Sequence, residues 1–269
     1  MGRSLETKMR RQEAREARKE KRMKHAVEKF AEEREEIQKV EPLVGLNPKQ
    51  KAMLRALREK TLIVVDGLAG TGKTYLAAAF AADLFRENQI DKIVVTRPLV
   101  YCGGKTSGYK PGGVVEKMGP YVRPMLEVIM SRLGKGAYKT ALANGTDGRI
   151  EILEFESVRG RSIGSSKCPT ILIVDEAQNA TPEELFSMIT RIGEGSKVIL
   201  LGDVYQRDTR NSGLKWLTTF IENHEGLDEF AEVIHFNRPE DIVRSGLTKA
   251  MITAVMEDAD DGLYVPISK

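Results

Sequence analysis

The chain has 269 residues, of which 41% are hydrophobic and 30% are charged, and its formal net charge is +3 at pH 7. This length admits one α/β core with an accessory segment and excludes two complete catalytic domains, because domains usually contain about 100 to 200 residues. Cys102 and Cys168 form no CxxC pair, and the three histidines stand far apart in the sequence. The composition therefore argues against a disulfide scaffold and against a local Cys/His metal site.

No apolar run approaches the length of a membrane span, which needs about 18 residues. The N-terminus is charged where a signal peptide would have an apolar segment. These features predict a protein with no membrane association, and the cysteine usage favours the reducing cytoplasm.

The N-terminal segment carries the excess of positive charge. Residues 1–40 contain 13 Lys or Arg and 9 Asp or Glu, whereas the remaining residues contain 29 and 30. Helix-favouring residues dominate this segment, and Pro42 interrupts the pattern. We therefore predict a charged helical arm and linker over residues 1–45, followed by one folded domain over residues 46–269.

Strand-like and helix-like segments alternate from residue 47 onward. Asn47 and Pro48 are typical N-cap and first-turn residues for a helix that extends to about Glu59. The pattern predicts strands at residues 61–65, 92–96, 150–155, 170–174, 197–201 and 232–236, and helices near 73–87, 114–144, 182–192, 213–224 and from about 240. Continuously apolar strands separated by helices indicate an α/β fold with a parallel sheet covered on both faces.

A phosphate-binding loop follows the first predicted strand. Residues 67–74 read GLAGTGKT and fit the pattern GxxxxGK[ST] at the start of a predicted helix. Glycines let backbone amides surround a phosphate, the helix N-terminus adds partial positive charge, and a lysine reaches the β and γ phosphates. The residues expected to bind the nucleotide are Gly67, Gly70, Thr71, Gly72, Lys73 and Thr74. The hydroxyl of Thr74 is also a candidate ligand for Mg²⁺.

Two adjacent acids follow the predicted strand at residues 170–174. Asp175 is a candidate Mg²⁺ ligand, and Glu176 is a candidate base that orients and deprotonates a water for attack on the γ-phosphate. Acids also favour the positive N-terminal end of a helix, so a structural role stays open. At the end of the next strand, Gly202-Asp203 begins a Gly-Asp-x-x-Gln segment, and Gln206 is a candidate γ-phosphate sensor.

Read together, these motifs resemble superfamily 1 helicases, and the segments between them resemble the PhoH-like ATPases. The matching segments are Thr96-Arg97-Pro98, Glu116-Lys117 with Pro120 to Pro124, Arg159-Gly160-Arg161, and Asp175 to Thr181. The resemblance extends from about residue 46 to about residue 255. It implies a RecA-like P-loop fold that uses ATP and Mg²⁺ and binds RNA or single-stranded DNA. It also implies a homo-oligomer, for which a hexameric ring with helicase activity is one form.

Two further roles follow from the resemblance. Gln50 stands where related helicases have a glutamine that hydrogen-bonds adenine, and Arg244 stands where an arginine finger is expected, acting across a subunit boundary. Ser245 replaces the histidine that commonly follows this arginine, which leaves an exposed helix arginine as the alternative. The expected catalytic residues are therefore Lys73, Glu176, Gln206 and Arg244.

Basic residues near glycines and tyrosines are candidates for nucleic-acid contact, because they pair with phosphates and the tyrosines stack on bases. These candidates are Arg97, Lys105, Lys110, Arg123, Arg159 and Arg161. The loop at residues 101–110 departs from the more regular family segment, in the region where the path of the nucleic acid is expected.

Three functions remain open from the sequence. The favoured one is an ATPase stimulated by nucleic acid. The alternatives are a nucleotide-controlled assembly protein that does not unwind strands, and a small-molecule phosphotransferase. The second alternative is disfavoured because the acid pair predicts water activation and no acceptor-binding motif is visible. The absence of NKxD and LSGGQ-like sequences argues against a GTPase and an ABC-type ATPase.

Overall fold

A computed structural model describes residues 40–99, 114–142, 148–158, 160–203 and 211–260, together with positions 18, 21, 23 and 24. By its internal contacts the chain divides into two units, residues 1–42 and 43–269. The helical arm expected before residue 40 lies almost wholly outside the described residues. The domain boundary expected at residues 45 and 46 stays a prediction.

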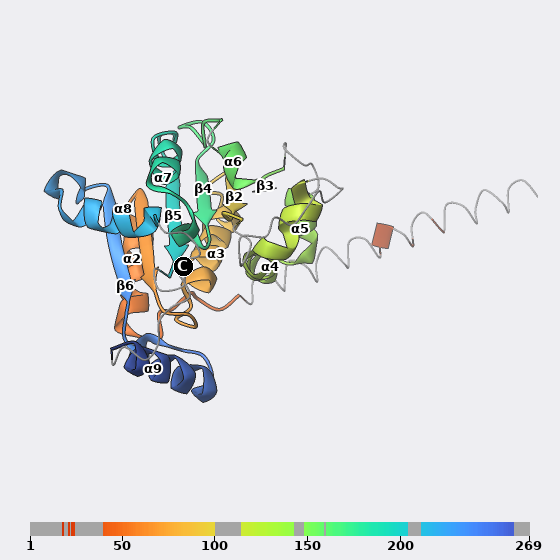
Figure 1. Ribbon diagram of the computed structural model, residues 1–269. Helices are drawn as coiled ribbons and strands as arrows, with labels where there is room; N and C mark the ends of the chain where they lie inside the picture. The colour runs from red at the N-terminus through yellow and green to blue at the C-terminus, as the bar shows by residue number, and fades with distance from the viewer. Residues whose placement is uncertain are drawn as a thin grey trace, which may run out of the picture. The chain divides into compact units, whose positions relative to one another are not determined.

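The core of the second unit is a parallel sheet (Figure 1). Its strands are β1 (Leu62–Gly67), β2 (Lys92–Thr96), β3 (Ile150–Ile152), β4 (Thr170–Val174), β5 (Lys197–Gly202) and β6 (Ala231–Phe236). They lie in the order β3-β2-β4-β5-β1-β6, and all neighbouring pairs are parallel. The predicted α/β class with a parallel sheet is confirmed.

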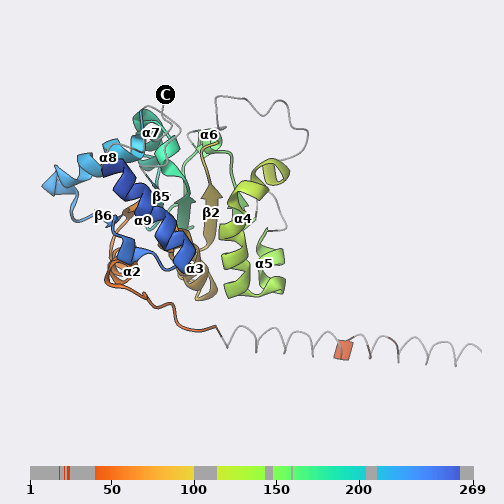
Figure 2. The ribbon, with the colours of Figure 1, turned by 60° about the horizontal axis from the view of Figure 1, so that its bottom comes forward.

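Helices pack on both faces of this sheet, because successive strand residues point to opposite sides. Ile63 and Val65 join a buried cluster with one group of helices, whereas Val64 joins a second cluster with another group. The first group is α2 (Pro48–Glu59), α3 (Lys73–Arg86), α4 (Val114–Leu133) and α5 (Lys135–Leu142). The second group is α6 (Phe155–Val158), α7 (Pro182–Ile189) and α8 (Gly213–Glu222). Figure 2 shows α4 and α5 on one side of β2, and α7 on the other.

The carboxyl ends of parallel strands share one edge of the sheet, which is where open α/β sheets bind ligands. Here β2, β4, β5 and β1 are consecutive neighbours. The segments that follow them begin with Arg97, Asp175, Asp203 and Leu68. Strand order therefore places four segments that are distant in the sequence along one edge.

Two predicted elements differ from the structure. The strand expected to reach residue 155 ends at Ile152, and Phe155 instead begins α6. The prediction of a closing helix from about Glu240 was also wrong. Residues 239–241 form a single 3₁₀ turn, and α9 is Gly246–Asp260. The segment between the 3₁₀ turn and α9 contacts the phosphate-binding loop, because the Val243 amide donates a hydrogen bond to the Gly70 carbonyl at 3.0 Å.

The predicted start of α2 is confirmed. Asn47 caps α2 by accepting a hydrogen bond from the Gln50 amide at 2.8 Å, and Pro48 is the first residue of the helix.

None of the described helices combines the length and the apolar character that a bilayer-spanning segment needs.

Candidate nucleotide-binding site

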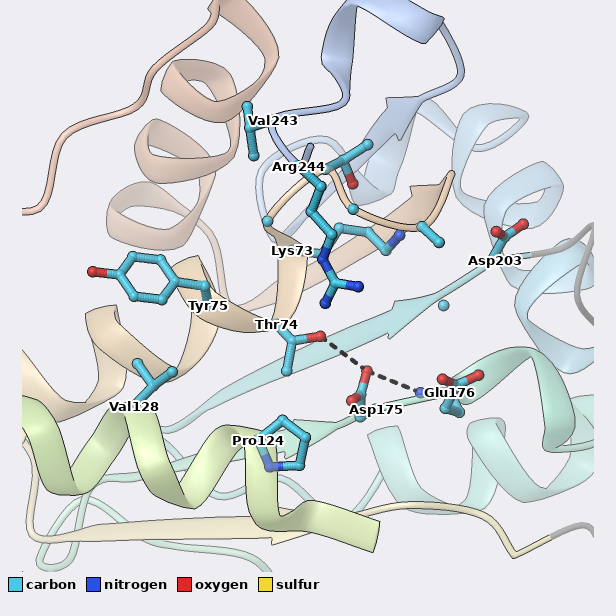
Figure 3. A pocket seen from close by; sticks show the side chains of 15 residues that line it. Lys73, Thr74, Tyr75, Pro124, Val128, Asp175, Glu176, Asp203, Val243 and Arg244 are labelled. Atoms are coloured by element: carbon cyan, nitrogen blue, oxygen red, sulfur yellow. Dashed lines mark hydrogen bonds between the residues drawn. The ribbon is translucent and has the colours of Figure 1, made fainter. Parts of the chain in front are cut away.

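A cavity of about 470 Å³ opens at the carboxyl edge of the sheet. Its polar lining includes Lys73, Thr74, Asp175, Glu176, Asp203 and Arg244, and its apolar lining includes Tyr75, Pro124, Val128 and Val243. Figure 3 shows Tyr75 and Val128 on the opposite side of Thr74 from Glu176 and Asp203. The phosphate-binding loop and the acid pair, about 100 residues apart in the sequence, therefore line one pocket.

Glycine geometry determines the path of the loop. Gly67 has φ +152°, and a Cβ added there would lie 2.3 Å from the Phe236 carbonyl oxygen. Gly72 has φ +86° and stands at the N-cap of α3. Thr71 is buried, and its hydroxyl donates to the Leu68 carbonyl at 2.9 Å. The Thr71 side chain thus holds the loop in shape, and Gly67 permits the close approach to β6.

Lys73 lies across the mouth of this loop. Its ammonium group donates to the carbonyl oxygens of Gly67 and Leu68, the latter at 2.8 Å. Burial lowers the pKa of Lys73, and the nearby carboxylates of Asp203 and Asp175 oppose this shift. The ammonium therefore sits where a phosphate can replace the loop carbonyls as its partner.

Thr74 and Asp175 form a pair of oxygen donors. The Thr74 hydroxyl donates to Asp175 Oδ1 at 3.4 Å, and the Glu176 amide donates to the same oxygen at 3.2 Å (Figure 3). Burial raises the pKa of Asp175, the charge of Glu176 adds to this shift, and Arg97 opposes it. A carboxylate disfavoured by burial and by a second carboxylate is relieved by a cation, and hard oxygen donors suit Mg²⁺.

The donor set has the small size typical of a magnesium site. Among the described residues, no group of three or more His, Cys, Asp or Glu side chains could hold a metal ion. Mg²⁺ commonly takes one or two protein ligands and completes its coordination with water and substrate phosphates. Thr74 and Asp175 fit this pattern.

Glu176 occupies a strained backbone position. Its φ of +55° lies in the left-handed region, which costs a non-glycine residue about 1–3 kcal/mol and is common at functional sites. One carboxylate oxygen accepts a hydrogen bond from Gln178 Nε2 at 2.6 Å, and the other lies 3.6 Å from a guanidinium nitrogen of Arg97. The candidate base is thus held by two side chains.

Gln178 links two strand tips, and sequence reasoning assigned it no role. Its side chain is fully buried, and its Oε1 accepts a hydrogen bond from the Asp203 amide at 3.1 Å. A Cβ added at Gly202 would lie 2.5 Å from this same oxygen. The signal in the sequence was an uncharged amide side chain two residues after Glu176, but its partner follows a different strand.

Gln50 contacts the loop from the side of α2. Its Nε2 donates to the Thr71 carbonyl at 2.9 Å, and its Oε1 accepts from the Leu46 amide at 2.7 Å. The residue is 3% exposed. Gln50 therefore supports the phosphate-binding loop, and its expected contact with adenine stays a prediction.

Arg244 reaches the pocket of its own chain. Its side chain extends between Lys73 and Thr74 in Figure 3, and a Cβ added at Gly70 would lie 3.2 Å from its Cγ and Cδ. The expected finger was placed across a subunit boundary. Here no second copy is needed to bring the guanidinium to the phosphate-binding loop, and its catalytic role stays a prediction.

Three of the candidate residues for nucleic-acid contact are described, and each pairs with a different glutamate. Arg161 forms two hydrogen bonds, at 3.0 and 2.9 Å, with Glu151, which is 2% exposed. Arg123 is highly exposed and pairs with Glu127 at 2.7 Å on α4. Arg97 forms an ion pair with Glu176 in the pocket. Arg161 thus has a structural partner, whereas Arg123 remains accessible.

Four predicted functional residues, Lys105, Lys110, Arg159 and Gln206, lie outside the described residues. The roles expected for them stay predictions.

This fold and pocket define a P-loop nucleotide-binding protein. Residues 42–256 match the model of the family described as PhoH-like protein, and this chain belongs to that family. It is 35% identical over 213 residues to Protein PhoH of Escherichia coli (strain K12), covering 79% of this chain and 58% of that protein. It is also 35% identical over 205 residues to a PhoH-like protein of Bacillus subtilis (strain 168), covering 76% and 61%.

The chain spans about three fifths of the length of these relatives. Among solved structures, the UvsW helicase from Bacteriophage T4 is similar with a TM-score of 0.42 and 16% identity, covering 77% of this chain and 67% of that one. The Pif1 helicase from Candida albicans is similar with a TM-score of 0.40 and 19% identity, covering 84% and 46%.

Proposed function

We propose that this protein hydrolyses ATP in a Mg²⁺-dependent reaction, and that RNA or single-stranded DNA stimulates the reaction. The observation that carries this proposal is the convergence of Lys73, Thr74, Asp175 and Glu176 on one pocket. A phosphate-binding loop alone is shared by kinases, GTPases and motors. The carboxylate that follows the candidate metal ligand favours hydrolysis, because attack by water needs a base or an orienting group.

In the proposed reaction, the oxygen of a water molecule forms a bond to the γ-phosphorus while the bond from that phosphorus to the bridging oxygen breaks. The bridging oxygen keeps the electron pair and leaves as part of ADP, and Glu176 accepts the proton of the water. Lys73 would exchange its loop carbonyls for phosphate oxygens. Thr74 and Asp175 would hold Mg²⁺, which neutralises phosphate charge.

Arg244 is the candidate for stabilising the transition state. Its guanidinium reaches into the same pocket as Lys73. A correctly placed arginine contributes about 10³ to 10⁵ in rate, since it neutralises the charge on the transferred phosphoryl group. We propose that Arg244 acts within its own chain, which permits hydrolysis whether or not the protein forms the homo-oligomer, or hexameric ring, expected from its family.

Phosphate release tests this function directly. We expect the wild type to release phosphate from ATP only with Mg²⁺, and faster with oligothymidylate or oligouridylate. Lys73→Ala is the negative control, because it removes a phosphate contact and should weaken ATP binding. Equal rates in wild type and Lys73→Ala would contradict the hydrolytic site. Turnover that does not respond to either oligonucleotide would contradict the coupling and favour a nucleotide-controlled assembly protein.

A strand-displacement assay then separates stimulation from unwinding. Displacement of a labelled strand that requires hydrolysable ATP would support helicase activity. Stimulated turnover without displacement would restrict the function to a nucleic-acid-dependent ATPase.

A further inference from the structure

The carboxylate of Glu176 has both oxygens engaged in this structure. Oε2 accepts a hydrogen bond from Gln178 at 2.6 Å, and Oε1 lies 3.6 Å from Arg97. A general base works when one of its carboxylate oxygens is free to contact the proton that it accepts. The geometry is therefore that of a restrained base.

The two partners of Glu176 differ in how easily they are displaced. Gln178 is fully buried and is also fixed through the Asp203 amide. The side chains of Arg97 and Glu176 are 31% and 33% exposed, and their separation is longer than the roughly 2.7–2.9 Å of a charge-assisted hydrogen bond. The ion pair is thus the weaker of the two restraints, and solvent reaches it.

Arg97 also stands at a suitable place to receive a signal from outside the pocket. It directly follows β2, the neighbour of the strand that carries the acid pair. Its partial exposure leaves guanidinium donors open to an incoming anion. A phosphate diester matches the planar donor geometry of arginine and forms paired, charge-assisted hydrogen bonds.

We infer that Arg97 restrains Glu176 in the absence of nucleic acid, and that a backbone phosphate of single-stranded nucleic acid takes Arg97 and releases Glu176 for hydrolysis. This inference rests on the proposed function, since it needs a nucleic-acid-stimulated ATPase. Arg97 is then a positioning residue that acts through Glu176. Gln178 keeps its hydrogen bond, so the released carboxylate stays at the pocket.

The test compares phosphate release by the wild type, Arg97→Gln and Arg55→Gln, each with and without oligothymidylate. Arg55→Gln is the matched control, because it removes an exposed arginine of α2 that pairs with Glu232 of β6 at 2.7 Å and does not line the pocket. Without oligonucleotide, Arg97→Gln should turn over about three- to fivefold faster than wild type, as expected for loss of a partly exposed ion pair. Further stimulation of Arg97→Gln should be lost, whereas Arg55→Gln should remain stimulated.

Affinity for the oligonucleotide gives a second readout that a purely structural role would not change. Loss of one phosphate contact should reduce the slope of log affinity against log salt by about one in Arg97→Gln. Unchanged affinity for a fluorescent ADP analogue would show that the pocket is intact. Arg97→Met, which keeps an unbranched apolar stem, repeats the test if Arg97→Gln fails to fold.

Several outcomes would overturn the inference while leaving the proposed function in place. One is a stimulated wild type together with an Arg97→Gln variant that keeps the same basal rate and the same stimulation. Another is a loss of turnover by Arg97→Gln both with and without oligothymidylate, which would mean that Arg97 assists Glu176 and does not restrain it. Equal stimulation of the wild type by inorganic polyphosphate would overturn nucleic acid as the occupant. Failure of the proposed function would be visible in the wild type alone, as absent phosphate release or as turnover that does not respond to the oligonucleotide.

Discussion

The phosphate-binding part of the pocket and its water-activating part are built in different ways. The first is one continuous segment, residues 67–74, whose shape depends on glycines and on hydrogen bonds to its own carbonyl groups. The second is assembled from segments that follow β2, β4 and β5, because Arg97 pairs with Glu176, and Gln178 connects Glu176 to the Asp203 amide. The phosphate-binding part is therefore sensitive to changes in backbone geometry. The water-activating part is sensitive to isosteric changes of polar side chains that leave the fold intact.

The largest effect should come from the water-activating part. Glu176→Gln keeps the size of the side chain and one acceptor oxygen but removes the charge and the base. We expect turnover to fall by about 10² to 10⁴, the usual contribution of a general base, while ATP affinity is retained. Phosphate release and binding of a fluorescent ATP analogue measure the two quantities. Turnover equal to that of the wild type would remove Glu176 from the reaction.

A backbone change should damage the phosphate-binding part next most strongly. Gly67→Ala places a methyl group against the Phe236 carbonyl at a positive φ, so we expect a loss of at least about 2 kcal/mol in the free energy of unfolding. Urea denaturation measures the loss. Gly119→Ala in α4 is the control, because nothing lies within 4 Å of the added Cβ, and it should be neutral or stabilising. Similar stability of both variants would contradict the tight approach of the loop to β6.

Gln50→Ala tests how far the loop depends on a side chain outside it. The change leaves the Thr71 carbonyl and the Leu46 amide without this partner, and we expect a loss of about 1–2 kcal/mol in stability. Affinities for ATP and GTP separate support of the loop from recognition of adenine. Equal losses for both nucleotides indicate support alone. A loss confined to ATP indicates the adenine contact expected from the family.

The smallest effect concerns His235, which lies beside Asp66, the residue before the loop. Its ring nitrogens lie 3.6 Å from Asp66 and 2.9 Å from Glu222. Asp66 raises the pKa of His235, Glu222 adds to this shift, and burial opposes it. This stabilisation is fully present below the ordinary histidine pKa of about 6.5 and is lost as pH rises through the raised value.

His235→Gln should therefore be less stable than wild type in acidic buffer and equally stable in alkaline buffer. The difference should stay below about 1 kcal/mol, because the side chain is 33% exposed and solvent screens the pair. Urea denaturation across pH measures it. A difference that grows with increasing pH would contradict the assigned pairing.

The features that the sequence determined by itself are those encoded within a few neighbouring residues. Asn47 and Pro48 start α2, the apolar runs form strands, and the glycine pattern of residues 67–74 forms a loop before α3. Each depends on local backbone preferences and on side-chain periodicity, which are readable from a short segment. The place of the acid pair beside this loop could also be expected, because parallel strands end at one edge of the sheet.

Only the tertiary structure decided which distant side chains meet. Arg97, whose expected contact with nucleic acid stays a prediction, pairs with Glu176, and Arg161 is held by the buried Glu151. The role of Gln178 and the delayed start of α9 also depend on contacts between segments far apart in the chain. Such contacts follow from strand order and from packing across the sheet, and no local pattern encodes either.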